Sequence, residues 1–157
     1  MAIKCKSEKR RQESLERAYW HVREVMTFIG CSVTEQPNVP SWVDSDTRLG
    51  KNLMDGINCR PLGVYVAPFV VYCIPGDHYQ FREMVMHECC HACQPGIGDD
   101  SVTVNSDGVP YEEQPHEIEA FMVSGIAQEL WCVPRDQWAE IVSAHKHIAA
   151  GSIRLHQ

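Results

Sequence analysis

Apolar residues recur at steps of three and four positions along four stretches of the chain, which predicts amphipathic helices. We place these helices at residues 7–29, 79–94, 115–132 and 134–150. Gly30 follows the first stretch and is a natural helix stop. Pro115 and Pro134 suit the first turn of a helix, because proline lacks an N–H that would be unpaired there.

Shorter apolar runs between the helices predict β-structure. Two strands are expected, at residues 63–67 and 69–74. Pro68 separates them and cannot donate to a ladder, which favours an edge strand or a bulge. Residues 31–61 are punctuated by proline and glycine and predict short strands and turns. Residues 95–114 predict a loop that carries a short strand at 101–104.

The order of these elements predicts an α+β fold with an N-terminal helix, a small antiparallel or mixed sheet, and C-terminal helices. A length of 157 residues, with 44% apolar and 22% charged residues, predicts a single globular domain over residues 1–157. The net charge of −7 argues against a nucleic-acid partner.

The start of the chain is basic and polar without an apolar segment, so a secretory signal is not expected. The longest apolar run covers residues 62–74, is interrupted by Pro68, and is too short to span a bilayer. We therefore expect a cytoplasmic protein without a membrane partner. Its 8 cysteines are expected to be reduced.

The strongest chemical signal is the sequence HECCH at residues 87–91, an HExxH motif inside a predicted helix. Side chains four positions apart on a helix point the same way, so His87 and His91 can bind one metal ion. Glu88 would then be the general base that takes a proton from an activated water. The alternative is a pair of surface histidines.

A catalytic zinc site needs a third protein ligand, and the helix at 115–132 offers Glu117 and Glu119. These two residues are about 200° apart around a helix, so they cannot both face one metal ion. Glu117 shares a polar stripe with Ser124 and Gln128, which favours Glu117 as the ligand. The alternative is an exposed carboxylate near the helix N-terminus, a position that suits Glu113 better.

The motif also contains a Cys90-x-x-Cys93 pair, which admits a second metal site or a redox function. Helix geometry places Cys89 and Cys93 on the face away from the histidines and Cys90 at the side. Packing in the core is therefore the favoured role for these cysteines.

The motif at 87–91, followed 26 positions later by Glu117-x-x-Ala120, resembles the gluzincin-type zinc metallopeptidases, particularly the compact ImmA/IrrE-like group. The resemblance covers about residues 60–134. Phe121 departs from it, because the family usually has Asn at that position. Proteins of this group are often encoded by phages and mobile elements.

The resemblance implies a zincin-like fold and one Zn²⁺ ion held by His87, His91 and Glu117. It makes Glu88 the catalytic residue of a metallopeptidase that hydrolyses peptide bonds in a protein or peptide substrate. It also implies that the strand region at 63–74 lies over the active-site helix and pairs with an extended substrate. The alternative for this region is a core strand without a role in substrate binding. The alternative functions are a zinc-binding structural or interaction protein without proteolysis and, more weakly, a cysteine-based redox protein.

A hydrolase also needs a donor for the developing oxyanion. Tyr111 and His116 are the nearest candidates in sequence to the third ligand, and His78 and Tyr79 are further ones. Each has the alternative role of a solvated polar residue.

Overall fold

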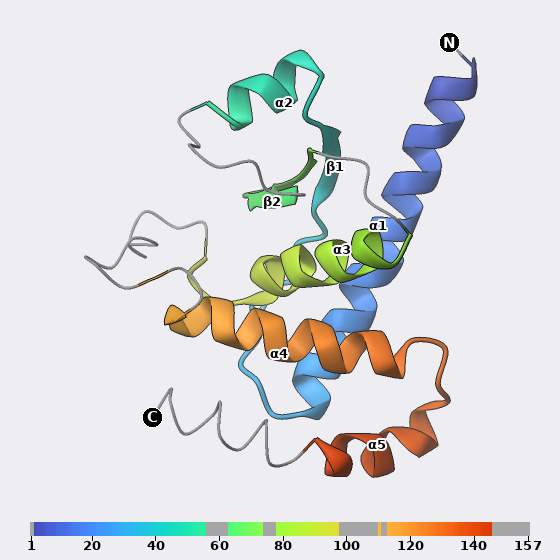
Figure 1. Ribbon diagram of the computed structural model, residues 1–157, viewed down its shortest axis with the longest axis vertical. Helices are drawn as coiled ribbons and strands as arrows, with labels where there is room; N and C mark the ends of the chain where they lie inside the picture. The colour runs from blue at the N-terminus through green and yellow to red at the C-terminus, as the bar shows by residue number, and fades with distance from the viewer. Residues whose placement is uncertain (1, 56–62, 74–77, 98–109, 111–112, 146–157) are drawn as a thin grey trace.

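The computed structural model describes residues 2–55, 63–73, 78–97, 110 and 113–145 (Figure 1). The helices are α1 (Ala2–Phe28), α2 (Arg48–Leu53), α3 (His78–Cys93), α4 (Pro115–Leu130) and α5 (Trp138–Ala144), with a 3₁₀ turn η2 (Arg135–Gln137) before α5. The strands are β1 (Ser41–Asp44), β2 (Gly63–Val66) and β3 (Phe69–Tyr72). The predicted α+β class is confirmed.

The long helices lie close to their predicted positions. Helix α1 begins at Ala2, earlier than expected, because residues 2–6 contain no proline or glycine that would prevent a helix. It ends at Phe28, just before the predicted stop at Gly30, whose φ of 87° is in the left-handed region. Cys31 then donates its N–H to Met26 O at 2.8 Å, which satisfies a carbonyl of the last turn.

Two other predictions need correction. Residues 31–61 contain β1 as expected, but also helix α2, which is too short to show periodicity. Thr47 caps α2 by accepting the N–H of Gly50. The last helix does not run from 134 to 150: it is divided into η2 and α5, and residues 146–157 lie outside the described residues. The strand expected at 101–104 also lies outside them.

The sheet is mixed, with the order β1-β3-β2. Strand β1 is parallel to β3, and β2 is antiparallel to β3. Pro68 lies in the turn between β2 and β3, so it interrupts no ladder, and β2 is the edge strand that the sequence predicts. Strand β2 packs on α3, where Gly63 approaches Met84 so closely that an added Cβ would lie 2.3 Å from its sulfur.

The register determines which backbone groups of β2 face outward. Ser45 donates its N–H to Tyr72 O at 2.8 Å, so Tyr72, and Val70 two positions before it, face β1. Their partners in β2 are Gly63 and Tyr65, which are therefore not hydrogen-bonded to β3. Both residues direct their N–H and C=O groups toward the outer edge of the sheet.

The other edge of the sheet, at β1, is closed by side chains. Gln12 of α1 accepts the N–H of Trp42 at 2.7 Å and donates to Pro40 O at 3.1 Å. Thr47 donates its hydroxyl to Asp44 O at 2.7 Å. These bonds satisfy backbone groups that a further strand would otherwise pair with.

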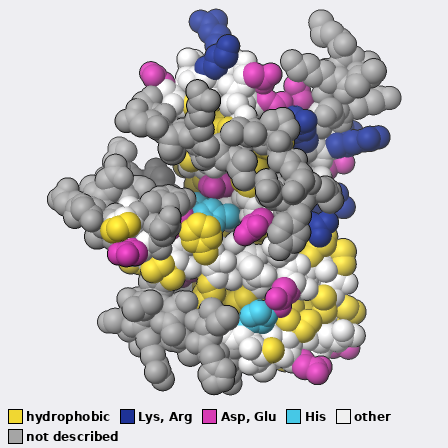
Figure 2. Space-filling model, in the orientation of Figure 1, with side chains coloured by type: hydrophobic (Ala, Val, Ile, Leu, Met, Phe, Trp, Pro, Cys, Tyr) yellow, Lys and Arg dark blue, Asp and Glu magenta, His cyan; other side chains and the backbone are white. Residues whose placement is uncertain are grey.

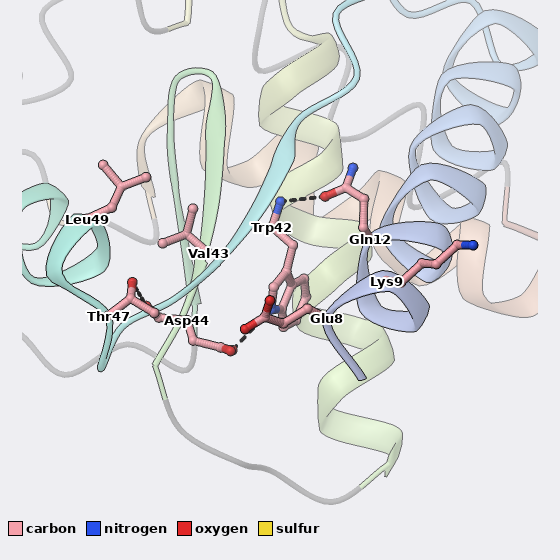
Figure 3. A pocket seen from close by; sticks show the side chains of 8 residues that line it. All are labelled: Glu8, Lys9, Gln12, Trp42, Val43, Asp44, Thr47 and Leu49. Carbon is pink, nitrogen blue, oxygen red and sulfur yellow. Dashed lines mark hydrogen bonds between the residues drawn. The ribbon is translucent and has the colours of Figure 1, made fainter. Parts of the chain in front are cut away.

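Beside this edge lies a surface cavity of about 450 Å³ (Figure 3). It is lined by Glu8, Lys9, Gln12, Trp42, Val43, Asp44, Thr47 and Leu49. None of the site residues predicted from the sequence lines it.

Helix α3 lies between the sheet on one side and α4 on the other, and α1 packs along both helices (Figure 1). The core lies where the three helices meet. Its fully buried members include Leu15, Tyr19, Val22, Met26, Met86, Cys89, Cys90, Val123 and Leu130. Among the described residues, no helix is long and apolar enough to cross a membrane.

Candidate metal centre

Helices α3 and α4 bring His87, His91 and Glu117 together in the interior. Glu117 Oε2 lies 2.9 Å from His87 Nε2, and its Oε1 lies 2.9 Å from His91 Nε2. The three residues are 7%, 6% and 4% exposed, so they are neither surface histidines nor an exposed helix-terminal carboxylate. One potential ligand atom from each residue lies within 4.8 Å of the others.

This donor set fits a metal ion such as zinc. Two imidazole nitrogens and a carboxylate oxygen are the ligand types that zinc takes at catalytic sites, at about 2.0–2.2 Å. Ligand atoms at those distances in a tetrahedron lie about 3.4 Å apart. The two observed separations of 2.9 Å, one from each carboxylate oxygen, are about 0.5 Å shorter than this, and one ligand atom from each of the three residues lies within 4.8 Å of the others.

The electrostatics of the group favour a positive charge at its centre. Burial lowers the pKa of His91, but the hydrogen bond to Glu117 and the nearby charges of Glu88 and Glu117 outweigh it, so the pKa is raised overall. The carboxylates of Glu117 and Glu88, which favour a proton on His91, also favour a metal cation at the same place.

Glu88 lies beside this group, as the HExxH spacing predicts. Its Oε2 accepts the N–H of Tyr65 at 2.8 Å, so the edge strand β2 holds the carboxylate in place. Burial raises the pKa of Glu88, and the charges of His91 and His87 oppose that shift. A carboxyl whose pKa is raised is a better proton acceptor than a free carboxylate at the surface.

The other glutamates near the start of α4 are not members of the group. Glu119 lies half-buried on another side of the helix, where it accepts the side-chain N–H of Gln94 at 3.1 Å. Glu113 is exposed. Ser124 and Gln128, which the sequence places on the stripe of Glu117, are respectively buried and half-buried.

The candidates for an oxyanion donor have different outcomes. His116 Nε2 lies 3.5 Å from Glu117 Oε1 and is buried without a hydrogen-bond partner among the described residues. Tyr111 lies outside the described residues, as do the side chains of His78 and Tyr79.

Sequence reasoning missed three neighbours of the centre. Tyr65 acts through its backbone, which no sequence pattern reveals. Gln94 contacts His91 Nδ1 at 2.6 Å, and its position three residues after His91 could have indicated this, because such residues are neighbours on a helix. The ring of Phe121 lies 4.5 Å from the ring of His87, centre to centre, and Phe121 is 48% exposed.

These contacts can be related to the molecular surface. In Figure 2, histidine and acidic side chains lie together near the middle of the face shown, with hydrophobic side chains beside them. The exposed aromatic residue next to a buried histidine is consistent with that pattern.

The cysteines of the motif belong to the core, as predicted. Cys89, Cys90 and Cys93 are fully buried, and Cys89 and Cys90 contact Leu15 O and Met26 Sδ of α1 at 3.9 and 3.8 Å. Burial raises the pKa of Cys93 to about 12. Among the side chains that the structure describes, the free thiols are Cys31, Cys73, Cys89, Cys90, Cys93 and Cys132.

Comparison with known proteins finds no match. No family model matches the chain, and no curated protein or solved structure matches it. The site must therefore be interpreted from its own geometry, which provides a buried group able to bind one metal ion.

Proposed function

We propose that this protein is a zinc-dependent metallopeptidase of the HExxH type with a zincin-like fold. The observation that carries the proposal is the carboxylate of Glu117, held 2.9 Å from the Nε2 atoms of both His87 and His91. Glu88 lies beside these ligands. The resemblance of the two sequence motifs to gluzincin-type peptidases agrees with this arrangement.

In the proposed enzyme, His87, His91 and Glu117 hold one Zn²⁺ ion. When bound, zinc polarises the substrate carbonyl and acidifies a water molecule. Three protein ligands leave a coordination position for this chemistry, as at other catalytic zinc sites.

The protein's own contribution to proton transfer is the Glu88 carboxylate. Tyr65 N–H holds its Oε2, which orients the carboxylate relative to the two histidines. Glu88 accepts a proton from the attacking water and then delivers it to the nitrogen of the departing amine. His116 is the candidate donor to the oxyanion, because its Nε2 is buried near Glu117 without a hydrogen-bond partner among the described residues.

Strand β2 is the proposed site for the peptide backbone of the substrate. Gly63 directs its N–H and C=O, and Tyr65 its C=O, to the outer edge of the sheet, where an extended peptide can add as a further strand. The N–H of Tyr65 is already donated to Glu88. The contact between Tyr65 and Glu88 brings this edge next to the proposed catalytic carboxylate. The other edge, closed by Gln12 and Thr47, is a poor site for such pairing.

A zinc-binding structural protein without proteolytic activity is the second candidate function. The low exposure of the three ligands, 4–7%, favours it, because a substrate would have little access to a group so deeply buried. The two functions share the metal site and differ in the role of Glu88.

The substitution Glu88→Gln separates them. The enzyme hypothesis predicts that this variant binds zinc as the wild type does and hydrolyses a fluorogenic peptide library about 10²- to 10⁴-fold more slowly. Glu83→Gln, which changes an exposed carboxylate on the same helix, is the matched control and should leave hydrolysis unchanged. Equal hydrolysis by wild type and Glu88→Gln would refute the catalytic assignment, and zinc binding without any hydrolysis in the wild type would favour the structural function.

A further inference from the structure

Gln94, the residue after α3, connects the two helices of the metal centre. Its Oε1 lies 2.6 Å from His91 Nδ1. Its Nε2 donates to the backbone carbonyl of His116 at 2.8 Å and to Glu119 Oε1 at 3.1 Å. Gln94 is 4% exposed, so water cannot readily replace these partners.

The partners of Gln94 determine the orientation of its amide. A backbone carbonyl accepts hydrogen bonds and cannot donate, and the same holds for an ionised carboxylate. The NH₂ group of Gln94 must therefore face His116 O and Glu119, which leaves Oε1 directed at His91. Since Oε1 also only accepts, His91 Nδ1 must carry the hydrogen of that bond.

We infer that Gln94 is a positioning residue that fixes a hydrogen of His91 on Nδ1 and so assigns Nε2 to the metal. Nε2 is the atom that lies 2.9 Å from Glu117 Oε1, at the centre of the proposed site. Glu117 also only accepts, so a protonated His91 donates from Nδ1 to Gln94 and from Nε2 to Glu117. A neutral His91 has a single hydrogen, which Gln94 holds on Nδ1; without Gln94 that hydrogen lies on Nε2 and is donated to Glu117. That bond would block the nitrogen that the metal requires.

Glu119 has a defined part in this arrangement. It does not reach the metal group but accepts from Gln94, and thereby keeps the amide from turning over. Helix α4 thus supplies Glu117, which is one of the proposed ligands. It also supplies Glu119, which orients the Gln94 side chain that contacts the ligand His91. The inference rests on the proposed metal site, and it adds that Gln94 and Glu119 determine how strongly the site binds.

The first test compares wild type with Gln94→Leu, which keeps the approximate size of the side chain and removes both hydrogen-bonding groups. Nitrogen-15 NMR of the metal-free protein, at a pH where the ring is neutral, is expected to show His91 with hydrogen on Nδ1 in wild type and on Nε2 in the variant. Zinc affinity, measured against a competing chelator, should fall about 10- to 100-fold. Gln128→Leu makes the same change at a half-buried position of α4 and should alter neither quantity.

The second test exchanges donor and acceptor between the two side chains. Gln94→Glu alone places a second acceptor against Glu119 and should weaken zinc binding. Adding Glu119→Gln restores a donor to that contact and should recover part of the loss, although the carbonyl of His116 still lacks its donor. In both variants His91 should keep its hydrogen on Nδ1, because the side chain at position 94 still presents an oxygen to it, and loss of that hydrogen would contradict the inference.

The inference is overturned if His91 keeps its hydrogen on Nδ1 in Gln94→Leu, or if zinc affinity is unchanged. If Gln94→Leu does not fold, Glu119→Ala decides the question. We expect this variant to show a measurable population of His91 with hydrogen on Nε2 and to bind zinc more weakly. If Glu119→Ala matches the wild type in both measurements, the inference is wrong. If wild type binds no zinc, the proposed function fails, whereas the NMR measurement on metal-free protein still decides the role of Gln94.

Discussion

Helix α3 packs against α1 through Cys89 and Cys90, which contact Leu15 and Met26, but against α4 through histidines that meet Glu117. The α1 contact is apolar, and burial alone stabilises it. The α4 contact places a carboxylate and two imidazoles in the interior, where loss of hydration opposes folding. The comparison indicates that burial alone stabilises the α1 contact, whereas the polar end of the α4 contact depends on what binds there.

The largest expected effect is the stabilisation of the α4 contact by zinc. At a free zinc concentration 1,000 times the Kd, binding to the folded state raises the free energy of unfolding by about 4 kcal/mol. Glu117→Ala removes one of three ligands and should abolish this gain at the same zinc concentration. Urea unfolding with and without zinc measures it, and Glu113→Ala, an exposed carboxylate, is the control. Equal stabilisation of wild type and Glu117→Ala would show that zinc binds elsewhere.

A smaller effect is expected from truncation in the α1 contact. Leu15 is fully buried, so Leu15→Ala should lower the free energy of unfolding of the metal-free protein by about 3 kcal/mol. The zinc affinity of the folded protein should not change, because Leu15 does not touch the metal group. Urea unfolding and chelator competition measure the two quantities. A tenfold change in zinc affinity would show that the two contacts are coupled.

The smallest effect concerns a third helix contact, in which His21 of α1 lies 2.7 Å from Ala127 O of α4. Burial lowers the pKa of His21 below its ordinary 6.5, while the bond to Ala127 and the charge of Glu24 oppose the shift. As the pH falls through 6.5, the unfolded chain therefore takes up a proton that the folded protein resists, and stability decreases.

His21→Gln retains a donor for the carbonyl of Ala127 but cannot titrate in this range. The metal-free variant should lose less stability than wild type between pH 7.5 and pH 5.5, as urea unfolding at the two pH values would show. Identical losses would mean that His21 is not protected from protonation. This result would remove His21 as the pH-sensitive group of the contact between α1 and α4.

The sequence predicted the parts of the molecule that depend on local pattern. Periodicity located α3 and α4. Because Glu117 and Glu119 lie at different angles around a helix, the sequence also predicted that Glu117, and not Glu119, contacts the histidines. Helix α2 was missed because six residues carry no period. It depends instead on the cap at Thr47 and on Gly50, where an added Cβ would lie 2.2 Å from Asp44 O.

The parts that depend on tertiary contact were not predictable in the same way. The hydrogen bond from Tyr65 N–H to Glu88 forms because β2 packs on α3 in one particular register. The sequence predicted the strand and the helix but not which residue of the strand lies opposite Glu88. The bonds from Gln94 to His116 O and Glu119 need the relative placement of α3 and α4. Such contacts orient the side chains that the motif only identifies.

The most direct test of the central claim is an anomalous difference map from crystals of the zinc-loaded protein. We predict a single strong zinc peak about 2.0–2.2 Å from His87 Nε2, His91 Nε2 and an oxygen of Glu117. A zinc peak at the cysteines, or no peak between the histidines and Glu117, would contradict the proposed metal centre.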